Sequence, residues 1–127
     1  MHNYKKGFRA EHELMKLLGS LGYAVLRAPK SGKDTIDLLA CKNTPYGPKI
    51  FVFESKFWAN TVRIDERQMN ALLSFAEKAG AKPIVAVKAA NDGWKFLQAE
   101  DVKENKGIAS NDLIAEKGFD IGFFEKF

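Results

Sequence analysis

The sequence predicts an α/β fold in which a mixed central β-sheet is flanked by helices. Segments with helical and with strand periodicity follow one another in the order helix, three strands, helix, two strands. The chain has 127 residues, which is enough for one compact domain with a core and too few for two ordinary domains. We therefore expect a single domain over residues 1–127.

The first half of the chain predicts one helix and three strands. Leucines recur at helical spacing between positions 14 and 21, so a helix is expected over residues 8–21, with Gly22 ending it. Strand-forming residues follow at 23–28, and the apolar run 36–40 predicts a second strand. Dense turn signals at 43–48 precede a third strand at 50–56, so the second and third strands should form an antiparallel hairpin.

The second predicted helix begins at Asp65 and runs to residue 79. Asp65 and Gln68 have the spacing of a capping box, and Ile64 and Met69 are placed to form a hydrophobic staple across the helix start. Gly80 follows as the expected end of the helix.

The pattern weakens toward the end of the chain. Residues 84–87 and 94–97 predict two more strands, separated by an Asn-Asp-Gly turn. Beyond them we expect a polar loop over 101–111, a short helix over 112–117 and a terminal strand over 119–124.

Composition and cysteine count exclude several classes of protein. Apolar residues make up 46% and charged residues 28%, which argues against a mainly disordered or membrane-spanning chain. The basic N-terminus has no apolar run of the signal-peptide kind, so a cytoplasmic location is expected. The single cysteine, Cys41, rules out an intrachain disulfide and a thiolate zinc site, and is expected to be a small buried apolar residue.

The positive charge of the chain is unevenly distributed. A formal charge of +4 and a pI near 9.2 permit an anionic partner without requiring one. Basic residues gather in the first third of the chain: Lys5, Lys6, Arg9, Arg27, Lys30 and Lys33. A phosphate-binding surface requires such clustering, although a merely solvated face would also produce it.

Charged residues interrupt the apolar pattern of the predicted hairpin. Asp37 lies inside the apolar run 36–40, where desolvation of its carboxylate is costly unless something compensates. Glu54 and Lys56 share one face of the third strand, about 7 Å apart. If the hairpin register brings Asp37 beside Glu54, two carboxylates converge on a rigid sheet with Lys56 at their edge.

Two carboxylates in this arrangement suit Mg²⁺, for which Mn²⁺ should substitute, because Mg²⁺ takes oxygen ligands and keeps several waters. The metal would hold a scissile phosphate, lower the pKa of a bound water and stabilise the charge that develops on phosphorus. Lys56 would orient or deprotonate that water, or neutralise the transition state. The backbone carbonyl of Ser55 is a further candidate ligand. The alternative is a structural ion pair in the sheet.

Glu11 is another acidic candidate, because it lies at the edge of the buried stripe of the first helix. Its carboxylate would bind a metal through water or position a lysine. The alternative is an ordinary exposed acid on a helix, whereas Glu13 points to another face.

The pattern Asp37…Glu54-Ser55-Lys56, on a hairpin after a helix bearing Glu11, resembles the active site of the restriction-endonuclease-like nucleases. Most of the first hundred residues are specifically similar to the archaeal-type Holliday-junction resolvases. The matching segments are residues 6–14, 22–27, 31–33, 75–83, 85–88 and 93–96. The resemblance implies a metal-dependent DNA endonuclease that cuts four-way junctions in DNA recombination and repair.

The resemblance also implies roles for individual residues. The implied catalytic set is Glu11, Asp37, Glu54 and Lys56, with Ser31 near the phosphate, Gln68 supporting the site, and Arg27 and Lys88 contacting DNA or lining the edge of the site. Some of these residues have ordinary explanations. Arg27 could extend from a strand end, Lys88 could cap a strand, and the capping box already accounts for Gln68.

Members of that family act as two-fold symmetric dimers, so the resemblance implies a homodimer whose two sites cut two strands symmetrically. The later part of the chain supplies apolar residues for either a dimer interface or the core of one subunit. These residues are Trp94, Phe96, Phe119, Phe123, Phe124 and Phe127.

Three other functions stay open on the sequence. The first is a nuclease with the same chemistry but a duplex, single-strand or flap substrate. The second is a noncatalytic DNA-binding module on the same scaffold, and the third is a structural protein whose charged hairpin is fortuitous. Substrate selectivity, loss of cutting on mutation and salt-dependent DNA affinity distinguish them.

Overall fold

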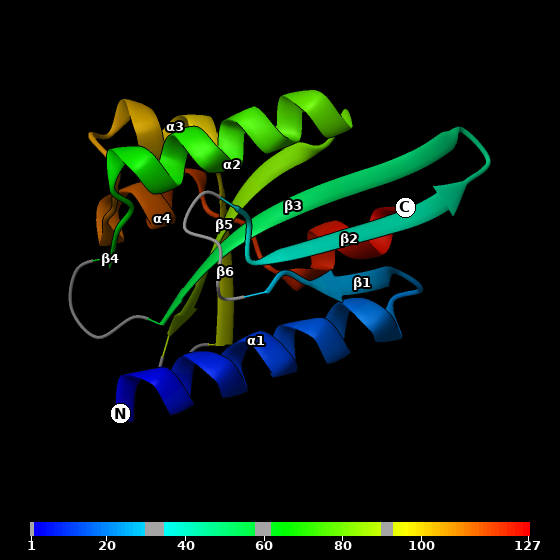
Figure 1. Ribbon diagram of the computed structural model, residues 1–127, viewed down its shortest axis with the longest axis horizontal. Coiled ribbons are helices and arrows are strands. Elements are labelled where there is room, and N and C mark those ends of the chain that lie inside the picture. Colours follow the sequence, from blue (N-terminus) through cyan, green and yellow to red (C-terminus); the bar gives the residue numbers. More distant parts are fainter. Residues whose placement is uncertain (1, 30–34, 58–61, 90–92) are drawn as a thin grey trace.

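The fold is a five-stranded sheet between two layers of helices, seen in a computed structural model that describes residues 2–29, 35–57, 62–89 and 93–127 (Figure 1). The strands are β1 (Ala24–Arg27), β2 (Leu38–Thr44), β3 (Gly47–Phe57), β4 (Val62–Arg63), β5 (Lys82–Ala89), β6 (Gly93–Gln98) and β7 (Ile108–Ala109). The helices are α1 (His2–Ser20), α2 (Glu66–Ala79), α3 (Ala99–Glu104), α4 (Asn111–Lys117) and the 3₁₀ helix η1 (Ile121–Lys126).

The main sheet has the strand order β1-β2-β3-β5-β6. β1, β2 and β3 are joined as antiparallel neighbours, β3 and β5 run parallel, and β6 is antiparallel to β5. β4 and β7 form a separate two-stranded pair. The predicted class, a mixed sheet flanked by helices, is therefore confirmed.

Alternation along β3 supplies side chains to the cores on both faces of the sheet. Phe51 and Phe53 pack with Leu14 of α1 and with η1 on one face. Val52 packs with Leu72 of α2 on the other face, where α3 also contributes. α1 and α2 consequently lie on opposite sides of the sheet (Figure 1).

The hairpin of β2 and β3 is longer than the apolar runs predicted. β2 continues to Thr44 and β3 begins at Gly47, because a two-residue turn lets backbone pairing continue through polar residues. β2 begins at Leu38, so Asp37 immediately precedes the strand rather than lying inside it. Cys41, expected to be buried, is only half-buried on β2.

The start and end of α2 are as predicted. Asp65 accepts from the backbone N–H of Gln68, and the Gln68 side chain accepts from the backbone N–H of Asp65, which completes the capping box. Ile64 and Met69 are both buried in the core beneath α2. Gly80 ends the helix in the left-handed conformation, with φ 66°, and its N–H donates to the carbonyls of Ala76 and Glu77 in the last turn.

Two predictions for the end of the chain are wrong. The expected loop over 101–111 contains most of α3 and all of β7; α3 buries only Ala99 and Val102, too few for a recognisable periodicity. The expected terminal strand over 119–124 is replaced largely by η1. Only Phe119 pairs as a strand residue, in an isolated bridge with Phe96, before the chain coils back onto the sheet.

The aromatic residues of this region pack within one subunit. Trp94, Phe96 and Phe124 are buried, and the other three are half-buried against the same core. Phe96 and Phe124 meet edge to face, with ring centroids 4.9 Å apart. Tyr23 donates from its hydroxyl to the Phe124 carbonyl at 2.9 Å. The three buried residues belong to the core of one subunit, and a dimer interface formed by the others stays a prediction. Among the described residues, no helix is long and apolar enough to cross a membrane.

Candidate functional site

The candidate site lies where the start of β2 meets the last residues of β3. Asp37 donates its backbone N–H to the Phe53 carbonyl at 2.9 Å, and its own carbonyl accepts from Ala28 at 2.9 Å. The paired register of β2 and β3 ends with Leu38 opposite Phe53, and Asp37 immediately precedes it. Asp37 therefore lies beside β3 close to Glu54, and its pairing with Glu54 at a metal stays a prediction.

The carboxylate of Asp37 is fixed by the neighbouring strand. Its Oδ2 accepts the backbone N–H of Ser55 at 2.7 Å and lies 3.4 Å from the Ser55 hydroxyl. A hydrogen bond to a charged acceptor is stronger than one between neutral groups. The Asp37 carboxylate is consequently held in a defined orientation just before the start of β2.

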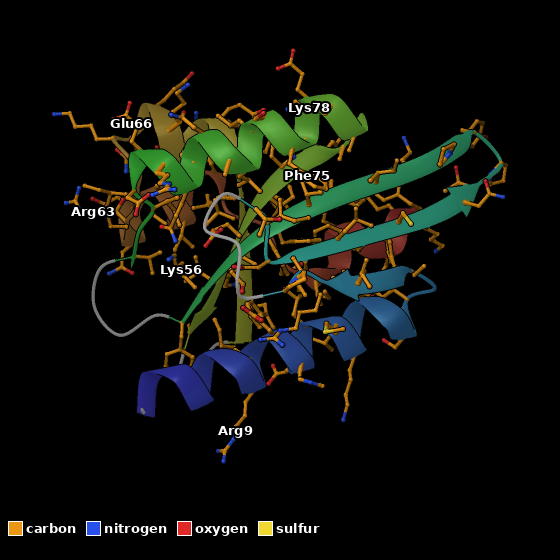
Figure 2. The ribbon with its side chains drawn as sticks, viewed as in Figure 1. Arg9, Lys56, Arg63, Glu66, Phe75 and Lys78 are labelled. Carbon is orange, nitrogen blue, oxygen red and sulfur yellow. The ribbon has the colours of Figure 1, made fainter. Side chains whose placement is uncertain are left out.

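Glu54 faces α2 and is 5% exposed. Its Oε2 lies 3.7 Å from Lys56 Nζ and 3.4 Å from Gln68 Nε2, which donates to it. Gln68 Oε1 accepts from Lys56 Nζ at 3.4 Å. Lys56 lies beside the beginning of α2 (Figure 2), so helix and strand together hold this acid–lysine pair.

Glu11 approaches the site from the other side of the sheet. It is 4% exposed in α1, and its Oε1 forms an ion pair with Arg27 Nε at 2.8 Å. Its Oε2 accepts from the Ser55 hydroxyl at 3.3 Å. Burial beside a cation shows that Glu11 is not the exposed helix acid of the alternative interpretation, because an unpaired buried carboxylate is very costly.

The site therefore draws on both faces of β3. Side chains alternate along the strand, so Glu54 and Lys56 face α2 whereas Ser55 faces α1. Asp37 reaches Ser55 from just before the start of β2. The structure thus connects Glu11, Asp37 and Ser55 as one group and Glu54, Lys56 and Gln68 as another, on adjacent residues of one strand.

The oxygen donors of the site fit a hard cation. The site has three carboxylates, on Glu11, Asp37 and Glu54, and two cations, on Arg27 and Lys56, so its described side chains have a formal charge of −1. Within the described ranges, no three acidic, histidine or cysteine side chains are grouped to hold one ion. Carboxylates are the oxygen donors that Mg²⁺ takes, one or two at a time together with water and phosphate oxygens.

Only some of the residues predicted to bind DNA lie in the part of the chain whose side chains the structure describes. Arg9 is exposed and extends from α1 away from the sheet (Figure 2). Lys5 and Lys6 belong to α1, but their side chains are outside what the structure describes, as are Lys30, Ser31 and Lys33 altogether. These five assignments stay predictions.

Lys88 forms an ion pair with Glu13, which the sequence analysis placed on another face of the first helix than Glu11. Glu13 Oε1 lies 2.6 Å from Lys88 Nζ and accepts from Trp94 Nε1 at 3.1 Å. Lys88 also lies 5.8 Å from the centre of the Trp94 ring. Glu13 thus connects α1 to β5 and β6. Lys88 and Trp94 are paired across the β5–β6 hairpin, so the sequence could have indicated that both contact the same acidic residue.

The comparison with known families now decides the class of the protein. A model of the archaeal Holliday junction resolvase family, Hjc, matches residues 2–123. The chain belongs to this family. The resolvase expectation drawn from the sequence is thereby confirmed at the level of the family.

Individual relatives agree with this membership. The chain is 32% identical over 111 residues to the crossover junction endodeoxyribonuclease Hjc of Sulfolobus acidocaldarius, covering 84% of this chain and 75% of that one. It is 35% identical over 88 residues to the enzyme of the same name from Methanocaldococcus jannaschii, covering 68% of this chain. The match spans only 62% of the length of the Methanocaldococcus relative.

A solved structure agrees on the fold. Hjc of Archaeoglobus fulgidus, a Holliday junction resolvase, superimposes with a TM-score of 0.80 over 95% of this chain and 96% of that one, at 22% identity. The restriction-endonuclease-like fold is therefore confirmed.

Proposed function

We propose that this Hjc-family chain cuts four-way DNA junctions by metal-dependent hydrolysis of phosphodiester bonds, in two strands symmetrically as a homodimer. The observation that carries the proposal is the contact of the Asp37 carboxylate with the backbone N–H of Ser55 at 2.7 Å. Ser55 lies between Glu54 and Lys56 on β3, and Lys56 Nζ is 3.7 Å from the Glu54 carboxylate. Family membership supports the junction as substrate.

Asp37, Glu54 and the backbone carbonyl of Ser55 would hold the metal, which we propose to be Mg²⁺ with Mn²⁺ as a substitute. When bound, such an ion positions a phosphate, activates a water and offsets transition-state charge. The protein holds the two carboxylates on a rigid sheet, which limits the reorganisation needed at the moment of reaction.

Lys56 serves the attacking water or the phosphate oxygens. Its ammonium lies between Glu54 and the Gln68 amide oxygen, so its position is set before DNA binds. A cation so placed neutralises negative charge that develops during hydrolysis. Glu11 completes the site from the α1 side, where it holds Arg27 and Ser55, and a contact with the metal through water is consistent with that place.

DNA would be bound through phosphate contacts made by basic residues of both subunits. The proposed contacts are Lys5, Lys6, Arg9, Arg27, Lys30, Ser31, Lys33 and Lys88. Contacts of this kind supply most of the affinity and little sequence preference. Two sites related by a two-fold axis match the two equivalent strands of a four-way junction.

A panel of DNA substrates tests the proposal. The protein is incubated with end-labelled four-way junction, linear duplex and flap DNA of matched sequence, each with Mg²⁺ and with EDTA. We expect cutting of the junction alone, at symmetric positions in two strands, and only with the metal. Equal cutting of all three substrates would favour the general nuclease. Salt-dependent binding without cutting would favour the noncatalytic module, and absence of DNA affinity would favour the structural protein.

A further inference from the structure

The side chain of Ser55 lies between two carboxylates that come from different parts of the chain. Its hydroxyl oxygen is 3.3 Å from Glu11 Oε2, in α1, and 3.4 Å from Asp37 Oδ2, at the start of β2. The neighbouring inward residues on this face of β3, Phe51 and Phe53, are fully buried and apolar. Ser55 is the next residue whose side chain points to this face of β3, and it places a hydroxyl beside the two carboxylates.

A serine hydroxyl has one proton, so it donates to only one of these carboxylates at a time. Asp37 Oδ2 also accepts the backbone N–H of Ser55 at 2.7 Å, and the second oxygen of Glu11 is paired with Arg27 at 2.8 Å. The hydroxyl therefore closes a continuous chain of contacts from Arg27 through Glu11 and Ser55 to Asp37.

We propose that the Ser55 hydroxyl is a positioning residue that orients the metal-binding carboxylate of Asp37 and couples it to Glu11. This inference rests on the function proposed above, and it adds a side-chain role to the backbone carbonyl considered there as a ligand. Groups that hydrogen-bond to metal ligands fix their orientation, so a cation meets a carboxylate already in place. The backbone N–H of Ser55 makes one contact with the Asp37 carboxylate, and the hydroxyl of the same residue adds another.

The coupling runs from Glu11 to Asp37. Glu11 is fixed by its ion pair with Arg27 and contacts the Ser55 hydroxyl with its other oxygen at 3.3 Å. Glu11 would therefore keep the Ser55 side chain in place beside the Asp37 carboxylate. Removing the hydroxyl should consequently weaken metal binding and also break the dependence of metal binding on Glu11.

Metal binding to the DNA-free protein is the direct test. Free Mn²⁺ is measured by electron paramagnetic resonance as protein is added, for wild type, Ser55→Ala and Ser55→Thr, with the exposed Ser74→Ala on α2 as the matched control. We expect Ser55→Ala to weaken Mn²⁺ binding about tenfold, the usual effect of losing a group that holds a metal ligand. Ser55→Thr, which keeps the hydroxyl, and the control should stay within about twofold.

A double-mutant cycle tests the coupling to Glu11. In wild-type background, Glu11→Gln should weaken Mn²⁺ binding, whereas in Ser55→Ala it should have a smaller effect, because the connecting group is already gone. Equal effects in both backgrounds would overturn the coupling. Circular dichroism identifies folded variants, and Ser55→Cys, close in size but a poor donor, serves if the alanine variant does not fold.

The outcomes separate this inference from the function on which it rests. If wild type binds Mn²⁺ and cuts junctions but Ser55→Ala binds Mn²⁺ equally well, the positioning role is overturned and the function stands. If alanine and threonine variants are weakened equally, the effect is one of packing and the hydroxyl has no role. If wild type neither binds Mn²⁺ nor cuts, the proposed function itself fails.

Discussion

Gln68 donates to Glu54 Oε2 at 3.4 Å from the first turn of α2. The same side chain accepts from the backbone N–H of Asp65 at 3.3 Å, so one glutamine both caps the helix and contacts the acid–lysine pair of β3. The two explanations that the sequence offered for Gln68 are thus compatible. The start of α2 is thereby tied to the geometry of Glu54 and Lys56.

Replacing Gln68 should affect both stability and cutting. Gln68→Ala removes half of the capping box and should cost about 1 kcal/mol in the free energy of unfolding. It also releases Glu54 and Lys56 and should slow junction cleavage about tenfold. Asp65→Ala is the matched control: urea unfolding should show a similar loss of stability, with cleavage close to wild type. Parallel losses of cleavage in both variants would reduce Gln68 to a helix cap.

Lys56 should be needed for cutting but not for binding. Lys56→Met keeps most of the side-chain volume and removes the ammonium that lies 3.7 Å from Glu54. We expect single-turnover cleavage to fall on the order of 10²-fold, as when another transition-state donor is removed. Junction affinity, measured by fluorescence anisotropy, should change less than about threefold, because many phosphate contacts remain. Cleavage at the wild-type rate would remove Lys56 from the mechanism.

Lys88 is paired with Glu13, and a measurement of salt dependence tests whether Lys88 also contacts DNA. If the ammonium contacts a phosphate while Glu13 holds it, Lys88→Ala should reduce the slope of log affinity against log salt by about one unit. Lys78→Ala, at the far end of α2 (Figure 2), is the control and should leave the slope unchanged. A Lys88→Ala slope equal to that of wild type would show that Lys88 only joins β5 to α1.

The features that the sequence predicted well are those that depend only on residues close together in the chain. The capping box of α2 and the left-handed Gly80 depend on neighbouring residues, so their spacing was sufficient. The sequence could place Asp37 near Glu54 only on the condition of a particular strand register. The register of β2 and β3 is determined by backbone pairing through the polar hairpin rather than by the apolar pattern, and it ends at Leu38, one residue after Asp37.

The contacts that the sequence did not predict join distant segments. The local sequence around Glu13 predicts only that it lies in a helix. Its contacts with Lys88 and Trp94 form because β5 and β6 pack beside α1 in the folded protein. The aromatic run near residues 119–124 looked like a strand because its residues are strand formers. It forms η1 because tertiary packing of Phe124 against Phe96 outweighs that preference.

Tyr23 makes a prediction about alkaline pH. Burial raises the pKa of its hydroxyl above the ordinary value of about 10, because the phenolate would lose its solvation. The unfolded chain therefore loses this proton first, so the stabilising contribution is complete below pH 10 and is lost as pH rises through the folded pKa. Tyr23→Phe should lose about 1 kcal/mol at pH 8, with its hydrogen bond to Phe124, and should show a weaker decline in stability above pH 10.

Urea unfolding of both proteins across pH 8 to 11 measures that difference. The predicted result is that the two stability curves converge as pH rises. Curves that stay parallel throughout would mean that the Tyr23 hydroxyl is not titrating differently in the folded and unfolded states.

The central claim is that Asp37 and Glu54 together hold the metal that cuts the junction. The most direct measurement is the cleavage rate of a labelled four-way junction at increasing Mg²⁺ concentration, for wild type and purified Glu54→Ala, with junction affinity measured in Ca²⁺ under the same salt. Our account predicts Mg²⁺-dependent cutting by wild type, no detectable cutting by Glu54→Ala, and junction affinity within a few-fold for both. Cutting by Glu54→Ala at the wild-type rate, or cutting by wild type in EDTA, would contradict it.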